Sequence, residues 1–289
     1  MISVIIPSYQ RPESLFGVLM NIYNQDVWRS IKGEILVSMD DSDENGDRYD
    51  FFIKQFQSIL KDDKRKLSVR LIINSTKGLV LAKNKAIEKS VGELIMMMDD
   101  DLYMESDYIS TLFKTIKEEK NCAATSGFII SSVPAISHTQ PSDYLEKLPQ
   151  KNKIQTLNIK QKEKSWRAVF GKKEQVMNWS KVVENLPLGK TYEVDYFVNS
   201  YMFKKKGFEL IGGYNIELNS KTSAHEEVDF TYRLGKKLGN LIINPSVKMW
   251  HITQKRGGIY KGKDFEESKQ FLEDEYGKML EPFLRSIKG

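Results

Sequence analysis

The sequence predicts an α/β fold built on a doubly wound, mostly parallel sheet. Short apolar segments of strand length alternate with segments in which apolar residues recur at helical spacing. The segment 94–98 is apolar without interruption, which is typical of a strand covered on both faces. Strands and helices that alternate in this way form parallel sheets, and right-handed crossovers place helices on both faces.

Four strands and three helices are predicted in the first part of the chain. The strands are residues 2–6, 34–39, 67–73 and 94–98. Pro12 suits the first turn of the first helix, which has apolar residues at 15, 18, 19 and 22. The second helix, around 49–60, is expected to bury Phe52, Phe56 and Ile59. The third starts at Leu79 and ends before Gly92.

The second part of the chain continues the alternation less regularly. Ser106 can cap a helix with an apolar face at 109–116. Strands are predicted at 123–130 and 242–250, and a helix begins at His225. The segment 131–190 is rich in Lys, Gln and Pro and is expected to be a loop-rich insertion. The tail from about 264 has helix-like spacing and is expected to pack on the body.

Composition disfavours several classes of protein. The net charge is +5, and the Lys residues between 147 and 190 are interpreted as solvated surface. The alternative is that they attract an anionic substrate or membrane surface. No apolar run approaches the ~20 residues of a membrane-spanning helix, and no secretory signal is recognised. The single Cys122 is expected to be buried, in agreement with a cytoplasmic protein. No zinc-ligand spacing, nucleic-acid motif, GxGxxG or GxxxxGK[ST] is found, which disfavours dehydrogenases and P-loop enzymes.

Three consecutive carboxylates, Asp99, Asp100 and Asp101, follow the strand at 94–98. In open α/β sheets, ligands bind beyond the carboxyl ends of the strands. Alternation along an extended chain would point Asp99 and Asp101 the same way and Asp100 the other. Two carboxylates aimed together repel unless a cation lies between them, and a hard divalent ion can also carry a diphosphate. The alternative is a polar turn, where Asp is common.

The loops after the first, second and fourth strands are expected to meet at one rim of the sheet. This topology would bring the acidic run close to residues from two other loops, namely Ser8, Tyr9, Arg11, Asp40 and Asp41.

Four motifs occur in order along this half of the chain: VIIPSY at 4–9, MDDS at 39–42, KGL with AKNKA between 77 and 86, and MDDD at 98–101. In order and spacing they resemble the GT-A nucleotide-sugar glycosyltransferases, and family 2 above all. The resemblance implies a GT-A fold with a nucleotide-sugar-binding half at 1–105. It implies an acceptor and catalytic half of the same domain at 106–260, interrupted by the 131–190 insertion, and a helical tail at 261–289.

The resemblance also implies which residues contact the donor. Ser8 and Tyr9 would line the base and ribose pocket, and Asp40 or Asp41 would accept a hydrogen bond from the base. Lys83 stands where the family often has Arg; the alternative is an exposed helix charge. The full implied set is Pro7, Ser8, Tyr9, Arg11, Asp40, Asp41, Lys77, Lys83, Asp99, Asp100, Asp195, Asn199 and Arg256, of which Asp195 and Asn199 would contact sugar hydroxyls.

A metal site is implied at the same rim. Asp101 would be the metal ligand of the family's DxD motif, Asp99 would approach the ribose or the metal, and His251 stands where many GT-A enzymes place a metal-binding His. Imidazole together with carboxylates suits Mn²⁺ better than Mg²⁺, and either ion is expected. A structural role is the alternative for His251. Arg256 belongs to a Gly-rich loop that could close over a diphosphate.

Glu226 and Glu227 begin a helix, where acids are often only a favourable match to the helix dipole. The family has an ED pair here whose second acid is the catalytic base, and Glu227 matches that acid with a side chain one carbon longer. Glu226 is the alternative base. Neighbouring carboxylates would raise the pKa of such a base toward neutrality.

The sequence hypothesis is a metal-dependent glycosyltransferase that moves a sugar from a nucleotide-diphosphate donor, a UDP-sugar first, to an acceptor hydroxyl with inversion. A retaining outcome stays open. The acceptor would be a glycan, a lipid-linked glycan or a protein or peptide, in cytoplasmic polysaccharide biosynthesis, with contact to the inner face of a membrane and a homodimer left open. The alternatives are a nucleotidyltransferase that uses a nucleoside triphosphate and a non-catalytic nucleotide-sugar- or glycan-binding relative.

Overall fold

The computed structural model describes residues 1–40, 44–61, 63–134, 190–194, 196–197, 200–219, 226–253, 267, 270–272 and 274. The strands are β1 Ile2–Pro7, β2 Gly33–Asp40, β3 Leu67–Asn74, β4 Leu94–Met97, β5 Leu102–Met104, β6 Cys122–Pro134, β7 Tyr192–Val194, β8 Tyr201–Lys204 and β9 Asn240–Thr253. The helices are α1 Pro12–Tyr23, α2 Gly46–Lys61, α3 Leu79–Lys89, α4 Tyr108–Glu118, α8 Lys205–Ile211 and α9 Glu226–Leu238, with short 3₁₀ turns at Asp26–Arg29 and Ile216–Leu218.

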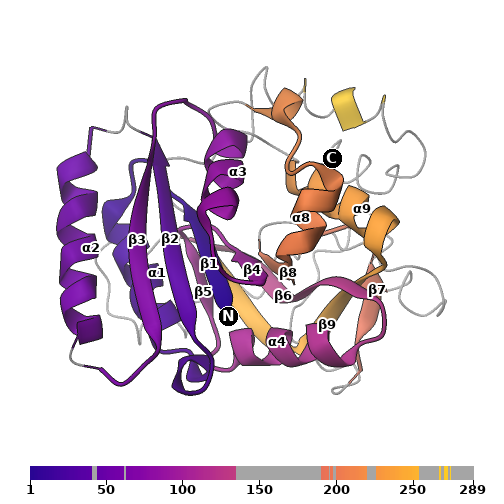
Figure 1. Cartoon of the computed structure of the whole chain (residues 1–289), viewed down its shortest axis with the longest axis horizontal. Helices are drawn as coiled ribbons and strands as arrows, with labels where there is room; N and C mark the ends of the chain where they lie inside the picture. The colour runs from indigo at the N-terminus through magenta and orange to yellow at the C-terminus, as the bar shows by residue number, and fades with distance from the viewer. Residues whose placement is uncertain are drawn as a thin grey trace.

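The described strands form one mixed, mostly parallel sheet in the order β3-β2-β1-β4-β8-β6-β9-β5, with β7 paired to β9 (Figure 1). The first four strands of this order are all parallel, as the sequence predicts. The second part of the chain adds antiparallel pairs, because β8 lies antiparallel between β4 and β6. The strand β9 is parallel to β6 but antiparallel to β5.

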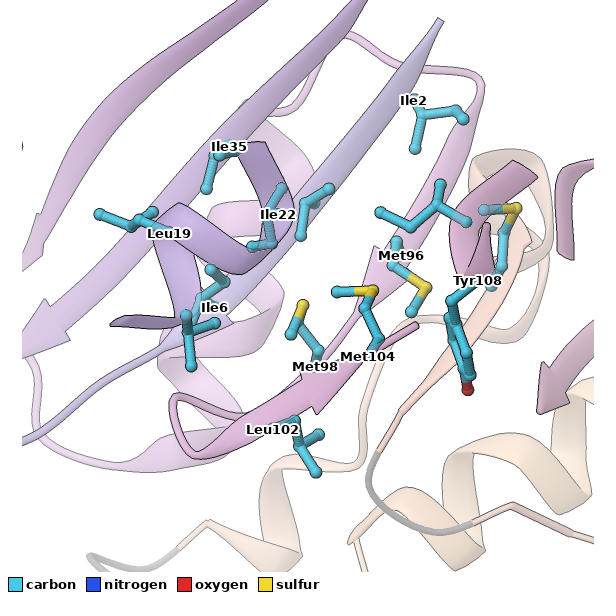
Figure 2. Packing of buried hydrophobic residues seen from close by; sticks show 14 of the residues in the cluster. Ile2, Ile6, Leu19, Ile22, Ile35, Met96, Met98, Leu102, Met104 and Tyr108 are labelled. Carbon is cyan, nitrogen blue, oxygen red and sulfur yellow. The ribbon is translucent and has the colours of Figure 1, made fainter. Parts of the chain in front are cut away.

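Helices cover both faces of the sheet, as predicted. In β1, Ile2, Val4 and Ile6 face a cluster that includes apolar residues of α1, α2 and α4, part of which Figure 2 shows. Ile5 faces the other cluster, to which α3, α8 and α9 contribute. Both faces of the central strands are therefore covered, which explains their continuous apolar sequences.

Several local predictions need correction. The buried face of α2 is Tyr49, Ile53 and Phe56, whereas Phe52 and Ile59 are only partly buried. The residue that precedes α4 is Asp107 rather than Ser106, and its side chain makes no capping hydrogen bond. Strands β5 and β7 were not predicted, because runs of three residues show no periodicity that can be recognised.

The described residues bear on three further expectations, which concern Cys122, a membrane-spanning helix and the insertion. Cys122 is buried, as predicted. Among the helices of the described segments, none is both long enough and apolar enough to cross a membrane. The strand β6 continues to Pro134, so the expected insertion does not begin at residue 131; residues 135–189 and almost all of the predicted tail lie outside the described part.

Candidate active site

Neighbouring strands bring the first two site loops together. In the parallel pair of β1 and β4, Ile5 is in register with Met97, so both chains leave the sheet at the same edge. Ser8 Oγ, just beyond β1, donates to Asp100 Oδ2 at 2.6 Å, just beyond β4. Both residues are buried. The predicted meeting of these loops at one rim is therefore confirmed for Ser8 and Asp100.

Arg11 joins two of the three consecutive carboxylates. Its Nη1 lies 3.0 Å from Asp100 Oδ1 and 2.7 Å from Asp101 Oδ2. Gln10 has a φ of 57°, a left-handed conformation, in the loop that carries Arg11 toward these acids. The expectation that Asp100 points away from Asp101 is wrong, because β4 ends at Met97 and alternation does not extend into the following turn.

Two hydroxyl groups that the sequence did not single out support this cluster. Tyr49 OH, from α2, lies 2.9 Å from Ser8 Oγ and accepts the Arg11 backbone N–H at 3.0 Å. Ser14 Oγ donates to the backbone oxygen of Asp100 at 2.8 Å. Tyr49 could be recognised in the sequence only as one more apolar residue at helical spacing. Burial raises the pKa of Asp100 to about 6, against the opposing effect of Arg11.

His251 reaches the same cluster from β9. It is in register with Leu102 of β5, and the neighbouring Ile252 N–H donates to the Asp101 backbone oxygen at 2.9 Å. His251 Nε2 thereby lies 3.2 Å from Asp101 Oδ1. Burial lowers the pKa of His251, but the carboxylates of Asp101 and Asp99 outweigh burial and raise it above its usual value.

A divalent ion fits the pair formed by Asp101 and His251. Asp101 Oδ1 is buried and accepts no hydrogen bond from any residue that the structure describes, although His251 Nε2 is close. A carboxylate oxygen beside an imidazole nitrogen is a donor set that Mn²⁺ accepts. In the described segments, no three or more His, Cys, Asp or Glu side chains lie together in an arrangement that could hold a metal ion. The side chains of this pair therefore offer two ligands.

A second charged cluster forms where α3 meets α9. Lys83 is fully buried, and its Nζ lies 2.7 Å from Glu226 Oε1 and 2.7 Å from Glu227 Oε1. Burial alone would lower the pKa of Lys83, but the two glutamates raise it well above its usual value. The interpretation of Lys83 as an exposed helix charge is therefore wrong.

Asp99 connects the two charged clusters electrostatically. Burial raises the pKa of its carboxyl group well above the ordinary value, and Glu227 and Asp101 raise it further, whereas Lys83 and His251 oppose them. These four neighbours come from separate places in the fold: Lys83 from α3, Glu227 from α9, His251 from β9 and Asp101 from the turn after β4. A metal or proton bound in one cluster therefore changes the electrostatic potential in the other.

Aromatic rings lie beneath the second cluster. Lys83 Nζ is 5.4 Å from the centre of the Tyr214 ring, which stacks on Phe230 at 4.1 Å. Tyr214 follows Gly212 and Gly213, whose φ angles of 76° and 78° are left-handed, so this turn needs residues without a side chain. Asn84 of α3 fixes the turn by accepting the Tyr214 N–H at 2.9 Å. The sequence shows the two glycines but not the position of the ring.

The pH dependence of stability follows from the burial of Glu226. Burial raises the pKa of Glu226 to about 7, although Lys83 opposes this shift. The unfolded chain loses this proton near pH 4.3, so deprotonation stabilises the unfolded state as the pH rises toward 7. We expect the difference in free energy of unfolding, wild type minus Glu226→Gln, to decrease as the pH rises from 5 to 8. Urea unfolding of both proteins measures it, and parallel pH curves would contradict the expectation.

The structure describes fewer contacts for the other residues that were predicted to bind the donor. Pro7 ends β1 and Asp40 ends β2, at the edge of the sheet where the carboxylates lie. Tyr9 is 42% exposed, and Lys77 is exposed, with its backbone oxygen accepting from Asn219. Asp41, Asp195, Asn199 and Arg256 lie outside the described residues.

Comparison with known proteins was made on sequence and on structure. The model of the family described as glycosyl transferase family 2 matches residues 3–175. No curated protein sequence matches the chain. Among solved structures, GalNAc-T7 with UDP, GalNAc and Mn²⁺ is similar with a TM-score of 0.62 and 13% identity, over 94% of this chain and 48% of that one.

Two further structures are similar in fold. The mannosyltransferase PcManGT from Pyrobaculum calidifontis, in complex with GDP-Man and Mn²⁺, gives a TM-score of 0.57 and 15% identity over 99% of this chain and 68% of that one. S. aureus TarS 1-349 gives a TM-score of 0.53 and 14% identity over 94% of this chain and 64% of that one. The chain thus spans about half the length of GalNAc-T7 and about two thirds of the other two.

Proposed function

The chain belongs to glycosyl transferase family 2, and from this premise we propose that it transfers a sugar from a nucleotide-diphosphate donor to an acceptor hydroxyl with inversion. The observation that carries the proposal is the pair of charged clusters at one edge of the sheet. One offers a buried carboxylate oxygen beside an imidazole, and the other offers a partly exposed carboxylate on a buried cation. These are the two functions that the reaction needs, a place for the diphosphate and a base for the acceptor.

The donor diphosphate would be held at the first cluster. Asp101 and His251 would hold Mn²⁺ or Mg²⁺, with Asp99 nearby, while Ser8 and Arg11 keep Asp100 in place. When bound, the ion neutralises the charge that develops on the leaving diphosphate. GalNAc-T7 and PcManGT share this fold and were solved with Mn²⁺ and UDP or GDP-Man, which supports a nucleotide-sugar donor. A UDP-sugar is the first candidate.

The remaining donor contacts follow the family resemblance. Pro7, Tyr9 and Asp40 would surround the base and ribose at the ends of β1 and β2, and Lys77 would approach from the turn before α3. Asp41, Asp195, Asn199 and Arg256 complete the set that we propose. Asp100 has a supporting role here, because both of its carboxylate oxygens are bound by other side chains.

Glu227 would act as the general base of the transfer. Its side chain is 12% exposed, compared with 3% for Glu226, so Glu227 is the better placed to meet an acceptor. It would take the proton from the acceptor hydroxyl as the oxygen forms a bond to the anomeric carbon. The bond from that carbon to the diphosphate oxygen breaks on the opposite face, which inverts the configuration. The acceptor would be a glycan, a lipid-linked glycan or a protein, in polysaccharide biosynthesis on the cytoplasmic side.

The identity of the released product tests this proposal against a nucleotidyltransferase, which would use the same carboxylates and metal. We expect a nucleoside diphosphate to be released from a nucleotide sugar in the presence of Mn²⁺. A coupled assay for nucleoside diphosphate and a second assay for pyrophosphate, run on the same panel of nucleotide sugars and nucleoside triphosphates, separate the two reactions. Pyrophosphate as the only product would contradict the proposal.

A further inference from the structure

A buried lysine joins the two glutamates that begin α9. Lys83 lies on the face of α3 that is packed against the protein, and its side chain is 0% exposed. Its ammonium group donates to Glu226 Oε1 and to Glu227 Oε1, both at 2.7 Å. A buried ammonium group is tolerated only when it is paired, so these contacts hold the three side chains in one arrangement.

The surroundings of Lys83 leave its ammonium group little freedom. The Tyr214 ring lies on one side, 5.4 Å from Nζ, and Tyr214 is itself fixed by Asn84 and by stacking on Phe230. Glu226 is buried and anchors the ammonium group from the side of α9. Glu227 is the more exposed of the two acids, so its carboxylate is the part of this cluster that can meet a substrate.

The cluster pairs one buried cation with two acids. Lys83 carries one positive charge, and Glu226 and Glu227 together carry two negative charges when both are ionised. The three groups therefore hold one negative charge in excess. The ammonium group of Lys83 is thus the counter-charge that both carboxylates share, each at 2.7 Å.

We propose that Lys83 is a positioning residue for the catalytic base, and that its ammonium group sets the place of the Glu227 carboxylate through the matched lengths of the two side chains. The inference rests on the proposed function, because it takes Glu227 as the base. Glu227→Asp shortens the acid by one methylene group, so its carboxylate can no longer reach both the Lys83 ammonium group and the acceptor hydroxyl. Lys83→Arg extends the cation by one atom and pushes the carboxylate out of place.

The double variant Lys83→Arg with Glu227→Asp restores the combined length of the two side chains. We expect each single variant to lose about 10²-fold in kcat, as a misplacement of about 1 Å can cost, with KM for the donor changed little. We expect the double variant to recover at least tenfold in kcat over either single variant. Lys89→Arg and Glu88→Asp make the same two changes at exposed positions of α3 and serve as controls that leave kcat unchanged.

Steady-state kinetics and thermal unfolding are measured for the wild type, these five variants and Glu227→Gln. A positioning role is supported if kcat recovers in the double variant and the unfolding temperatures of the variants do not follow the same order as their kcat values. A double variant that fails to fold, or whose loss in kcat is the product of the two single losses, overturns the inference. Glu227→Gln with full activity would instead show that the base was assigned wrongly, which separates failure of the proposed function from failure of this inference.

Discussion

Asp101→Ala is expected to lower the release of nucleoside diphosphate by roughly 10³-fold or more, because a bound metal supplies several kcal/mol of stabilisation to the leaving group. Asp101 is the carboxylate that offers a buried oxygen without a hydrogen bond, 3.2 Å from His251 Nε2. The variant should also lose the gain in nucleotide affinity that Mn²⁺ provides. Release of nucleoside diphosphate and titration calorimetry measure the two effects.

The control for this prediction is Asp107→Ala, which removes an exposed carboxylate just before α4. It should leave both activity and nucleotide affinity unchanged. Asp101 also pairs with Arg11, so thermal unfolding must show that the Asp101 variant is folded. Asp100, which lies 3.0 Å from Arg11 Nη1 in the wild type, is the partner that Arg11 is expected to keep. A folded Asp101→Ala protein with full activity would exclude the metal-binding role.

Glu227→Gln is expected to lower transfer by roughly 10²–10⁴-fold, which is the contribution of a general base. Donor and metal binding should change much less than transfer, because Asp101 and His251 lie in the other cluster, where removal of the Glu227 charge acts at a distance through Asp99. The amide has the same shape as the carboxylate and can still accept a hydrogen bond from Lys83 through its oxygen. Single-turnover transfer and calorimetric donor binding separate the two properties.

Glu226→Gln provides the matched comparison, since the two glutamates are neighbours that contact the same ammonium group. We expect it to keep much more activity than Glu227→Gln, because Glu226 is buried away from any acceptor. If Glu226→Gln is the inactive variant and Glu227→Gln is active, the base is Glu226 and the assignment is wrong by one position.

Much of the fold was predictable because its signals are local. Continuous apolar strands such as 94–98 and the helical spacing of α1 depend on neighbouring residues, and both were recognised. The parallel arrangement of β1 to β4 follows from the alternation of strands and helices. The antiparallel position of β8 between β4 and β6 does not follow from local sequence, because it is set by contacts between distant segments.

The candidate site was also predictable only in part, namely where it depends on local sequence and strand order. The predicted topology placed Ser8, Arg11 and the acidic run at one rim of the sheet. It could not show that the Arg11 side chain contacts both Asp100 and Asp101. Lys83 and Glu227 were two separate departures from the usual family residues, 144 positions apart. Only the folded chain shows that they contact each other, because helix α3 and helix α9 meet through tertiary packing.

Calorimetric titration of the wild-type protein tests the central claim most directly, namely that the rim carboxylates hold a divalent ion against a diphosphate. UDP, GDP, dTDP and CDP are each titrated with Mn²⁺ and without it. We expect at least one of them to bind, with an affinity that depends on Mn²⁺. The absence of heat with all four nucleotides in the presence of Mn²⁺ would contradict the account.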